Sequence, residues 1–253
     1  MNDLDLRPRS STEIVDAAFQ LFRRNPTPLI LAAALVYVPW LVIRLIFDLG
    51  ITDPMMGPNK ALVYIAGSLV VYAVVGGVAS VVASDIYLGN PPDLPAAFRL
   101  AASRFVTLVV SGLIRAVLIG VGIAFFLFPG LYALGRYFAV TQAVVLEGKG
   151  TGGALSRSSQ LSVDLKRHIV NTILLIGLVS VAISFGFGLL FSLFQSKVIS
   201  NVIATGVSVV LYPLFGLTET LLYYDAKIRK EGFDVEYLAR ADESSAASER
   251  AAI

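Results

Sequence analysis

VTLVVSGLIRAVLIGVGIAFFLF, residues 106–128, is the stretch of sequence that decides the fold. Arg115 is its only charged residue. A helix of about 20 apolar residues crosses the hydrocarbon core of a bilayer, and such a helix satisfies its own backbone hydrogen bonds where water is absent. Residues 106–128 are therefore predicted to span a membrane.

Further apolar segments of this kind run along the chain. Four have comparable length: 28–49, 61–82, 170–194 and 198–223. A fifth, 131–145, is shorter and carries Arg136 and Gln142. Phe128-Pro129-Gly130 is predicted to be a turn, because one helix over 106–145 would be about twice as long as the bilayer is thick. The predicted fold is an all-α integral membrane protein with about six transmembrane helices.

Composition indicates that lipid, and not a protein interior, surrounds these segments. Hydrophobic residues make up 56% of the chain and charged residues 15%, against about 45–50% and about 25% in soluble domains. The net charge is only +2 and the basic residues are spread over several connections, which argues against a nucleic-acid partner. The chain has no cysteine, and therefore no disulfide or thiolate ligand.

Lys and Arg residues predict the orientation, because cytoplasmic connections are enriched in them. Nearly all lie before the first span, in the second and fourth connections, or after the last span, whereas the opposite side has only Lys60 and Lys197. Both termini are therefore predicted to be cytoplasmic, in the cytoplasmic (inner) membrane, which requires that 131–145 also crosses. Residues 1–11 lack the apolar region of a signal peptide, so the first span is expected to be an uncleaved anchor.

A short amphipathic helix on the membrane surface is predicted before each of three helical hairpins. In the first, Ser10 and Glu13 form a capping-box pattern ahead of an apolar face. Its predicted membrane-interface residues are Ile14, Phe19, Phe22, Arg23 and Arg24. Asp93 is predicted to cap the second helix, and the third runs over 154–164. These units form one membrane domain over 1–238 and suggest a repeat with uneven spacing, followed by a disordered tail over 239–253.

Charged side chains inside spans mark the candidate site, because a charge at the bilayer centre costs about 3 kcal/mol or more. Arg44 has Asp48 one turn away, which predicts an ion pair near the membrane surface. Arg115, about 15 Å deep by helical rise, is predicted with Arg136 and Glu219 to form an intramembrane polar or ligand site. The pairing of these arginines with backbone carbonyls, with Glu219 or with each other explains them equally well.

Other patterns give little chemistry. Residues 148–153, GKGTGG, match the dinucleotide-binding fingerprint in letters, but a span precedes them where the fingerprint needs a strand, so they are predicted to be a flexible connection. The only histidine, His168, is predicted to be a solvated flank of a span. No cluster of His, Cys, Asp or Glu predicts catalysis, a metal site or a cofactor.

Several short motifs resemble those of one family. They are EIVDAAFQLFRRN at 13–25, PGLYALGR at 129–136, VVLEG at 144–148, ALSRS at 154–158 and LYYDAKIRKEGFD at 222–234. By these motifs the chain resembles the glycerophosphoryl diester phosphodiesterase membrane-domain family, which is related to uncharacterised six-span membrane proteins of bacteria and archaea. In the members that name the family, such a membrane region is joined to a phosphodiesterase domain. This sequence has no room for that domain, so the resemblance implies no hydrolase activity.

The predicted function is that of a non-catalytic membrane protein, an accessory or scaffold module that contacts membrane lipids and other membrane proteins. The alternative is a transporter or permease for a small or lipid-like molecule, which the buried arginines, Pro39 and Pro213 favour. A polar cavity converging on Arg115 and Arg136 would favour transport. A closely packed bundle with paired arginines would favour the module.

Overall fold

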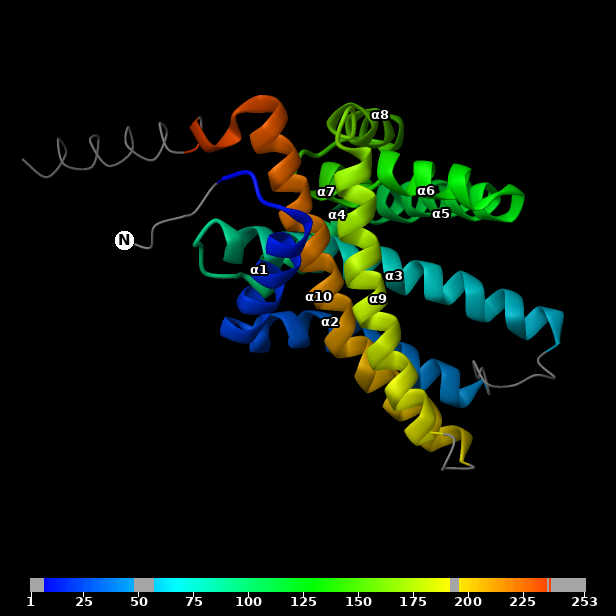
Figure 1. Ribbon diagram of the computed structural model, residues 1–253. Coiled ribbons are helices and arrows are strands. Elements are labelled where there is room, and N and C mark those ends of the chain that lie inside the picture. The colour runs from blue at the N-terminus through cyan, green and yellow to red at the C-terminus, as the bar shows by residue number, and fades with distance from the viewer. Residues whose placement is uncertain (1–6, 48–56, 192–195, 236, 238–253) are drawn as a thin grey trace, which may run out of the picture.

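The computed structural model describes residues 7–47, 57–191, 196–235 and 237, and these residues fold into helices (Figure 1). The helices are α1 (Ser11–Arg24), α2 (Pro26–Ile46), α3 (Pro58–Tyr87), α4 (Leu94–Ser103), α5 (Phe105–Phe125), α6 (Leu127–Arg136), α7 (Val140–Val145), α8 (Thr151–Leu161), α9 (Lys166–Phe191) and α10 (Lys197–Glu231). Five described helices, α2, α3, α5, α9 and α10, are long and apolar enough to cross a membrane, as the all-α membrane prediction requires. The tail predicted at 239–253 lies outside the described residues.

The segment predicted to span at 131–145 is not one helix. It is divided between α6 and α7, and the chain leaves the first of these at Tyr137. The turn before it also differs from the prediction, because α5 ends at Phe125 and the extended residue Phe126, with φ −161° and ψ 151°, reverses the chain. Pro129 therefore lies in the first turn of α6, where a missing N–H removes no intrahelical hydrogen bond.

Two glycines let α5 and α6 approach backbone to backbone. A Cβ atom on Gly122 would lie 2.7 Å from the Gly130 nitrogen, and one on Gly130 would lie 2.8 Å from the Ile123 nitrogen. Real Cβ atoms do not make contacts this short. The one-residue turn at Phe126 is therefore possible because each helix has a glycine where the two backbones approach.

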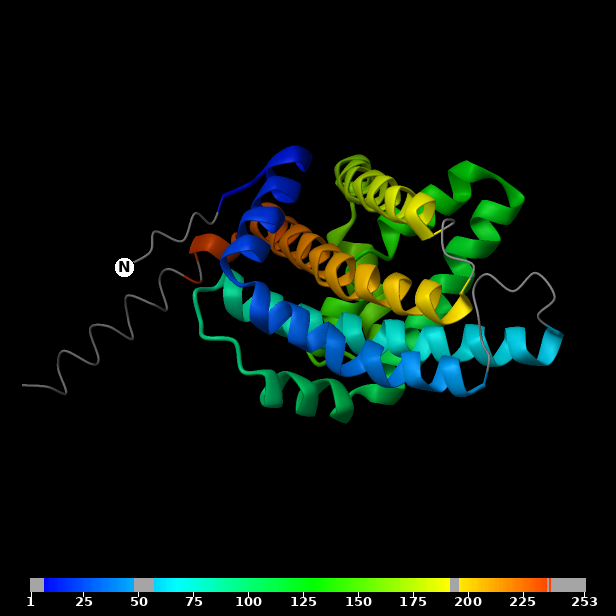
Figure 2. The ribbon, with the colours of Figure 1, turned by 90° about the horizontal axis from the view of Figure 1, so that it is seen from below.

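The long helices are splayed, because α3 and α5 run nearly across Figure 1 whereas α9 runs steeply down it, but their turns all lie on the right-hand side in Figure 2, which gives the bundle two distinct ends. At one end α2 and α9 finish, α3 and α10 begin, and α5 turns into α6; we call it the hairpin end. The opposite end, the basic end, carries these exposed cationic residues: Arg23, Arg24, Lys149, Arg167 and Lys230. Arg104 Nη1 donates a hydrogen bond of 3.0 Å to the Gly148 carbonyl, so the chain that leaves the basic end in α5 has returned there after α7.

α1, α4 and α8 are the short helices that the sequence predicted. The Ser10 hydroxyl accepts a hydrogen bond from the Glu13 amide and the Glu13 carboxylate accepts one from the Ser10 amide, which completes the predicted capping box. Asp93 caps α4 by accepting a hydrogen bond of 3.0 Å from the Ala96 amide. α8 begins at Thr151, ahead of the predicted start. α1 packs on α9 and α10, whereas α4 packs on α3 and α5, so the short helices do not occupy equivalent places.

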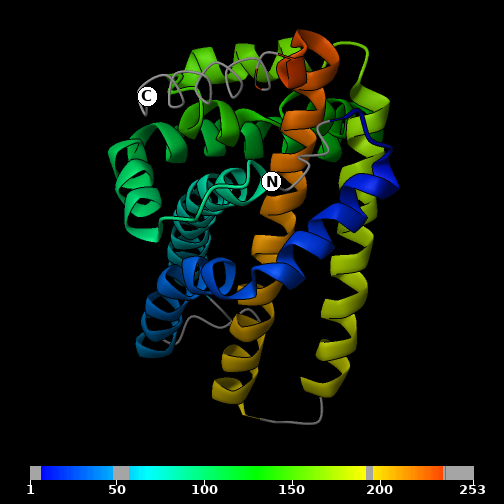
Figure 3. The same cartoon turned by 90° about the vertical axis from the view of Figure 1, so that its left-hand side faces the viewer.

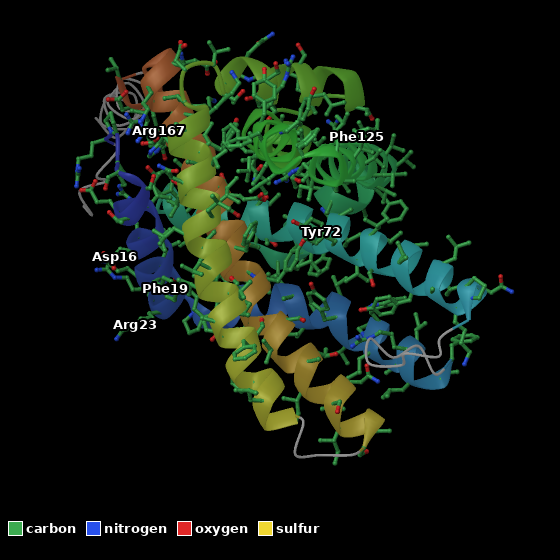
Figure 4. All side chains as sticks on the ribbon, turned by 45° about the vertical axis from the view of Figure 1, so that its right-hand side comes forward. Asp16, Phe19, Arg23, Tyr72, Phe125 and Arg167 are labelled. Atoms are coloured by element: carbon green, nitrogen blue, oxygen red, sulfur yellow. The ribbon has the colours of Figure 1, made fainter. Side chains whose placement is uncertain are left out.

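The apolar face of α1 contacts protein. Ile14 is fully buried, and Phe19 and Phe22 are half-buried against the same core. α1 crosses α9 and α10 in Figure 3, while Arg23 points away from the bundle in Figure 4. Ile14 therefore docks α1 onto the bundle, contrary to its predicted membrane contact, whereas Arg23 and Arg24 stay exposed.

The protein core lies nearer the basic end, as α10 shows. Its residues between Leu214 and Ile228 are mostly buried. Val198, Val202 and Val210, nearer the hairpin end, are 44–55% exposed. Lipid tails are as apolar as these side chains, so exposure of this kind carries no hydrophobic penalty in a bilayer.

Candidate functional site

Arg115 and Glu219, two of the three predicted intramembrane site residues, meet in the interior. Arg115 projects from α5 and Glu219 from α10, and Arg115 Nη2 lies 2.5 Å from Glu219 Oε1. Each residue is only 7% exposed. Because an isolated charge is far more costly to bury than a hydrogen-bonded pair, each side chain makes the burial of the other possible. The pair joins α5 to α10, near the middle of the predicted span 106–128 but close to the basic end of the predicted span 198–223.

Arg136, the third predicted site residue, lies elsewhere. Its carbonyl accepts a hydrogen bond of 3.0 Å from the Ser158 hydroxyl of α8. Its guanidinium donates a hydrogen bond of 3.4 Å to the Tyr132 hydroxyl and lies 5.6 Å from the centre of the Tyr137 ring. Arg115 and Arg136 therefore do not form one site. The predicted group of three residues is divided, with Arg136 apart from the other two.

Aromatic side chains gather between α2, α3 and α10, on the hairpin side of the ion pair. The Tyr72 and Tyr212 rings meet edge to face with centroids 4.8 Å apart, and the Tyr212 hydroxyl donates a hydrogen bond of 3.3 Å to the Tyr72 carbonyl. Figure 4 labels Tyr72 on α3, and the residue is 43% exposed. Trp40 and Tyr64 pair nearer the hairpin end, with centroids 6.3 Å apart.

Two cavities adjoin this aromatic group. The Arg44 cavity, about 190 Å³, is lined by these residues among others: Tyr37, Trp40, Arg44, Tyr64, Tyr72 and Thr205. The Tyr212 cavity, about 220 Å³, is lined by these among others: Ser180, Val207, Leu211, Tyr212 and Phe215. Both cavities touch Tyr72 and Ser208. These shared residues place the two cavities next to each other along α10, with the Arg44 cavity nearer the hairpin end.

Arg44 is the site residue that the sequence reasoning missed. It is 5% exposed, its Nη2 donates a hydrogen bond of 2.5 Å to Thr205 Oγ1, and its Nε has no acceptor among the described residues. The predicted partner, Asp48, lies outside the described residues. A signal was present, since Tyr37, Trp40 and Arg44 are spaced by three and four positions and so share one face of α2.

A second polar network, also missed, lies at the basic end around Asp225. Its side chain is 3% exposed. Oδ2 lies 3.1 Å from His168 Nε2 and accepts a hydrogen bond of 2.8 Å from Arg229 Nε, and Oδ1 accepts one of 2.7 Å from the Arg9 amide. His168 is thus a bonded, partly buried residue and not the solvated flank that was predicted. The network fastens the N-terminal segment to α9 and α10.

Arg157 of α8 joins three parts of the chain at the same end. Its Nε donates hydrogen bonds of 2.8 Å to both Glu147 carboxylate oxygens, and its Nη1 donates one of 2.5 Å to Glu231. The hydrogen bond to Glu231 is the main cause that raises the pKa of Arg157. The Tyr223 hydroxyl completes the cluster with a hydrogen bond of 2.8 Å to Glu147. Of the predicted flexible connection 148–153, only residues 148–150 connect packed helices, because residues 151–153 form the first turn of α8, and the element that precedes them is helix α7 and not a strand.

Comparison of the chain with protein-family models, with curated proteins and with solved structures gives no match. The resemblance to the phosphodiesterase membrane-domain family therefore stays a prediction. Within the described residues no three His, Cys, Asp or Glu side chains come together as metal ligands would.

Proposed function

We propose that the chain is a non-catalytic polytopic protein of the cytoplasmic membrane, an accessory or scaffold module that contacts lipid. The observation that carries the proposal is the buried Arg115 and Glu219 pair, which satisfies the charge at the centre of the bundle without a ligand. By the criterion drawn from the sequence, a packed bundle with a paired central arginine favours a module over a transporter.

Lipid contact is supported by the surface where the start of α9, at the basic end, meets α6. Lys166 and the exposed Arg167 border an open hollow of about 540 Å³ whose other walls include Phe128, Leu131 and Tyr132. Lysine and arginine beside apolar side chains suit the headgroups and upper tails of anionic lipids. Figure 4 places Arg167 near the start of α9 and Phe125 at the far end of α5.

We infer six crossings with both termini in the cytoplasm. The hydrogen bond between Arg104 and Gly148 supports an α5 to α7 segment that leaves and re-enters the same side. Because the chain has no cysteine, single cysteines report sidedness cleanly. In intact cells an impermeant maleimide should label Asn59→Cys, at the hairpin end, and should label Gln160→Cys only after the membrane is opened. Labelling of Gln160→Cys in intact cells would overturn this orientation.

The proposed lipid contact is tested with the full chain in nanodiscs. The melting temperature should be higher with phosphatidylglycerol present than in phosphatidylcholine alone, and added salt should reduce the difference by screening. The double variant Arg23→Gln/Arg24→Gln should show a smaller gain. Equal melting temperatures in both lipids would contradict the proposal.

A transporter for a lipid-like molecule is the second candidate, which the two adjoining cavities favour. A fluorescent phospholipid placed in one leaflet of proteoliposomes separates the two functions. The module should leave the rate of lipid exchange between leaflets as in protein-free vesicles. A rate that rises with the amount of protein would replace the module with the transporter.

A further inference from the structure

We propose that the Arg44 cavity binds the phosphate group of a membrane lipid in the leaflet at the hairpin end, with one acyl segment in the Tyr212 cavity. This inference rests on the proposed lipid-contacting function and names the lipid group and the residues that hold it. The site belongs to α2, α3, α9 and α10, away from the cationic surface of the basic end.

The charge of Arg44 requires an anion. Within the described residues no carboxylate lies at ion-pair distance from Arg44, although the residue is 5% exposed. Thr205 Oγ1 donates its own proton to the Asn201 carbonyl at 2.8 Å, so it serves Arg44 as a neutral acceptor only. A buried guanidinium with an unused Nε–H is a binding group for phosphate oxygens, which accept paired N–H donors.

The depth of the cavity matches a lipid phosphate. Arg44 lies two positions before the end of α2 at Ile46, which is about 3 Å along the helix axis. Trp40 and Tyr64 line the same cavity, and tryptophan and tyrosine concentrate at the level of lipid headgroups. The positive charge therefore stands where the phosphates of that leaflet lie.

The size and lining of the two cavities match a headgroup followed by a tail. At about 190 Å³ the Arg44 cavity is smaller than the roughly 300–1,000 Å³ of drug-binding pockets, so it admits one polar group of a larger molecule. The Tyr212 cavity lies beyond it, and the hydroxyls of Ser180 and Ser208 already donate to Ile176 and Ala204 of their own helices. With these two hydroxyls occupied and with Val207, Leu211 and Phe215 in its wall, the cavity suits an acyl segment.

The test is native mass spectrometry of the full chain released from mild detergent. Wild-type protein should retain a bound phospholipid, and Arg44→Gln should retain about tenfold less, because it loses a charge-assisted hydrogen bond. Arg136→Gln, which changes a half-buried arginine outside both cavities, should retain the wild-type amount. Ser208→Leu, which fills the junction of the two cavities and leaves Arg44 in place, should also lose the lipid.

Other outcomes identify other partners. If inorganic phosphate binds the delipidated protein and Arg44→Gln abolishes this binding while no lipid is retained, the phosphate chemistry stands and the lipid source is wrong. Equal lipid retention by wild type, Arg44→Gln and Ser208→Leu overturns the site. If Asp48→Asn and Arg44→Gln lower the melting temperature equally and neither changes bound lipid, the acceptor is Asp48 and the proposal is overturned. The melting temperature of Arg44→Gln in phosphatidylglycerol nanodiscs separates this site from the proposed function. If it is still higher than in phosphatidylcholine, the lipid-contacting function holds even where the Arg44 site is wrong.

Discussion

Arg115 and Arg44 are buried to a similar degree, 7% and 5% exposed, yet only Arg115 has a carboxylate partner among the described residues. Arg115 faces α10 beside the main core, where helices pack closely. Arg44 faces a cavity near the hairpin end, where the exposed valines of α10 show that protein packing is thin. A membrane bundle thus accommodates a buried arginine either with a carboxylate of its own or with space for an anion from outside.

The Arg115 region should give the largest loss of stability. Arg115→Leu leaves the Glu219 carboxylate buried without a partner, so the free energy of unfolding should fall by about 3–5 kcal/mol. The double variant Arg115→Leu/Glu219→Leu removes both charges and should recover most of this loss. Chemical unfolding in mixed micelles measures both. An equal loss in the single and double variants would show that packing, and not charge, decides stability there.

Asp225 tests whether a buried carboxylate with partners inside the protein also stabilises the basic end. Asp225→Asn weakens its bonds to His168 and Arg229, so we expect a loss of about 1–3 kcal/mol. Asp164→Asn is the matched control, because the Asp164 side chain is 82% exposed in its pair with Lys230, and exposed pairs contribute about 0–1 kcal/mol. A loss as small as that of the control would mean that the bonds of Asp225 stabilise the protein no more than an exposed ion pair does.

Gly122 tests the close packing of α5 on α6. Gly122→Ala places a methyl group against the backbone at Gly130, so overpacking should cost about 1–3 kcal/mol. Gly120→Ala, on the same helix, meets no atom within 4 Å and should change stability little. The melting temperatures of the two variants in one detergent are the measurement. If both behave alike, the α5 and α6 backbones are farther apart than the structure places them.

Arg44→Leu should act with the opposite sign to Arg115→Leu. In lipid-free detergent it removes a buried charge that has no carboxylate, so the free energy of unfolding should rise by about 1 kcal/mol. Thr205 keeps its bond to the Asn201 carbonyl in this variant. A loss comparable to that of Arg115→Leu would mean that Arg44 has an internal partner and would erase the contrast between the two regions.

Glu13 should give the smallest effect, confined to α1. The Ser10 amide, followed by the Arg7 side chain, lowers the pKa of the Glu13 carboxyl from 4.5 to about 2. The carboxylate is thus favoured in the folded state, and its contribution is complete above pH 4.5 and lost as the pH falls toward about 2. Amide NMR shifts of Ser10 should follow this titration. Glu13→Gln should abolish it without disturbing either buried arginine.

The sequence alone predicted the elements whose cause is local. The apolar runs predicted α2, α3, α5, α9 and α10, because length and composition decide whether a helix is stable in lipid. The caps at Ser10 and Asp93 were predicted for a similar reason, since a cap needs only a side chain and an amide three residues away. The α6 and α7 segment was the shortest and most polar of the predicted spans, and there the local signal gave the wrong turn and an uninterrupted helix.

Only the tertiary structure decided which polar residues meet. Arg115 and Glu219 are 104 positions apart, and the pattern of charges did not distinguish this pair from one with Arg136. The tertiary structure likewise placed the apolar face of α1 on α9 and α10 and left Arg44 beside a cavity. Apolar periodicity predicts that a helix has an apolar face, but it does not predict whether lipid or protein covers that face, because the two are nearly equally apolar. Only the packing of the helices against one another decides this.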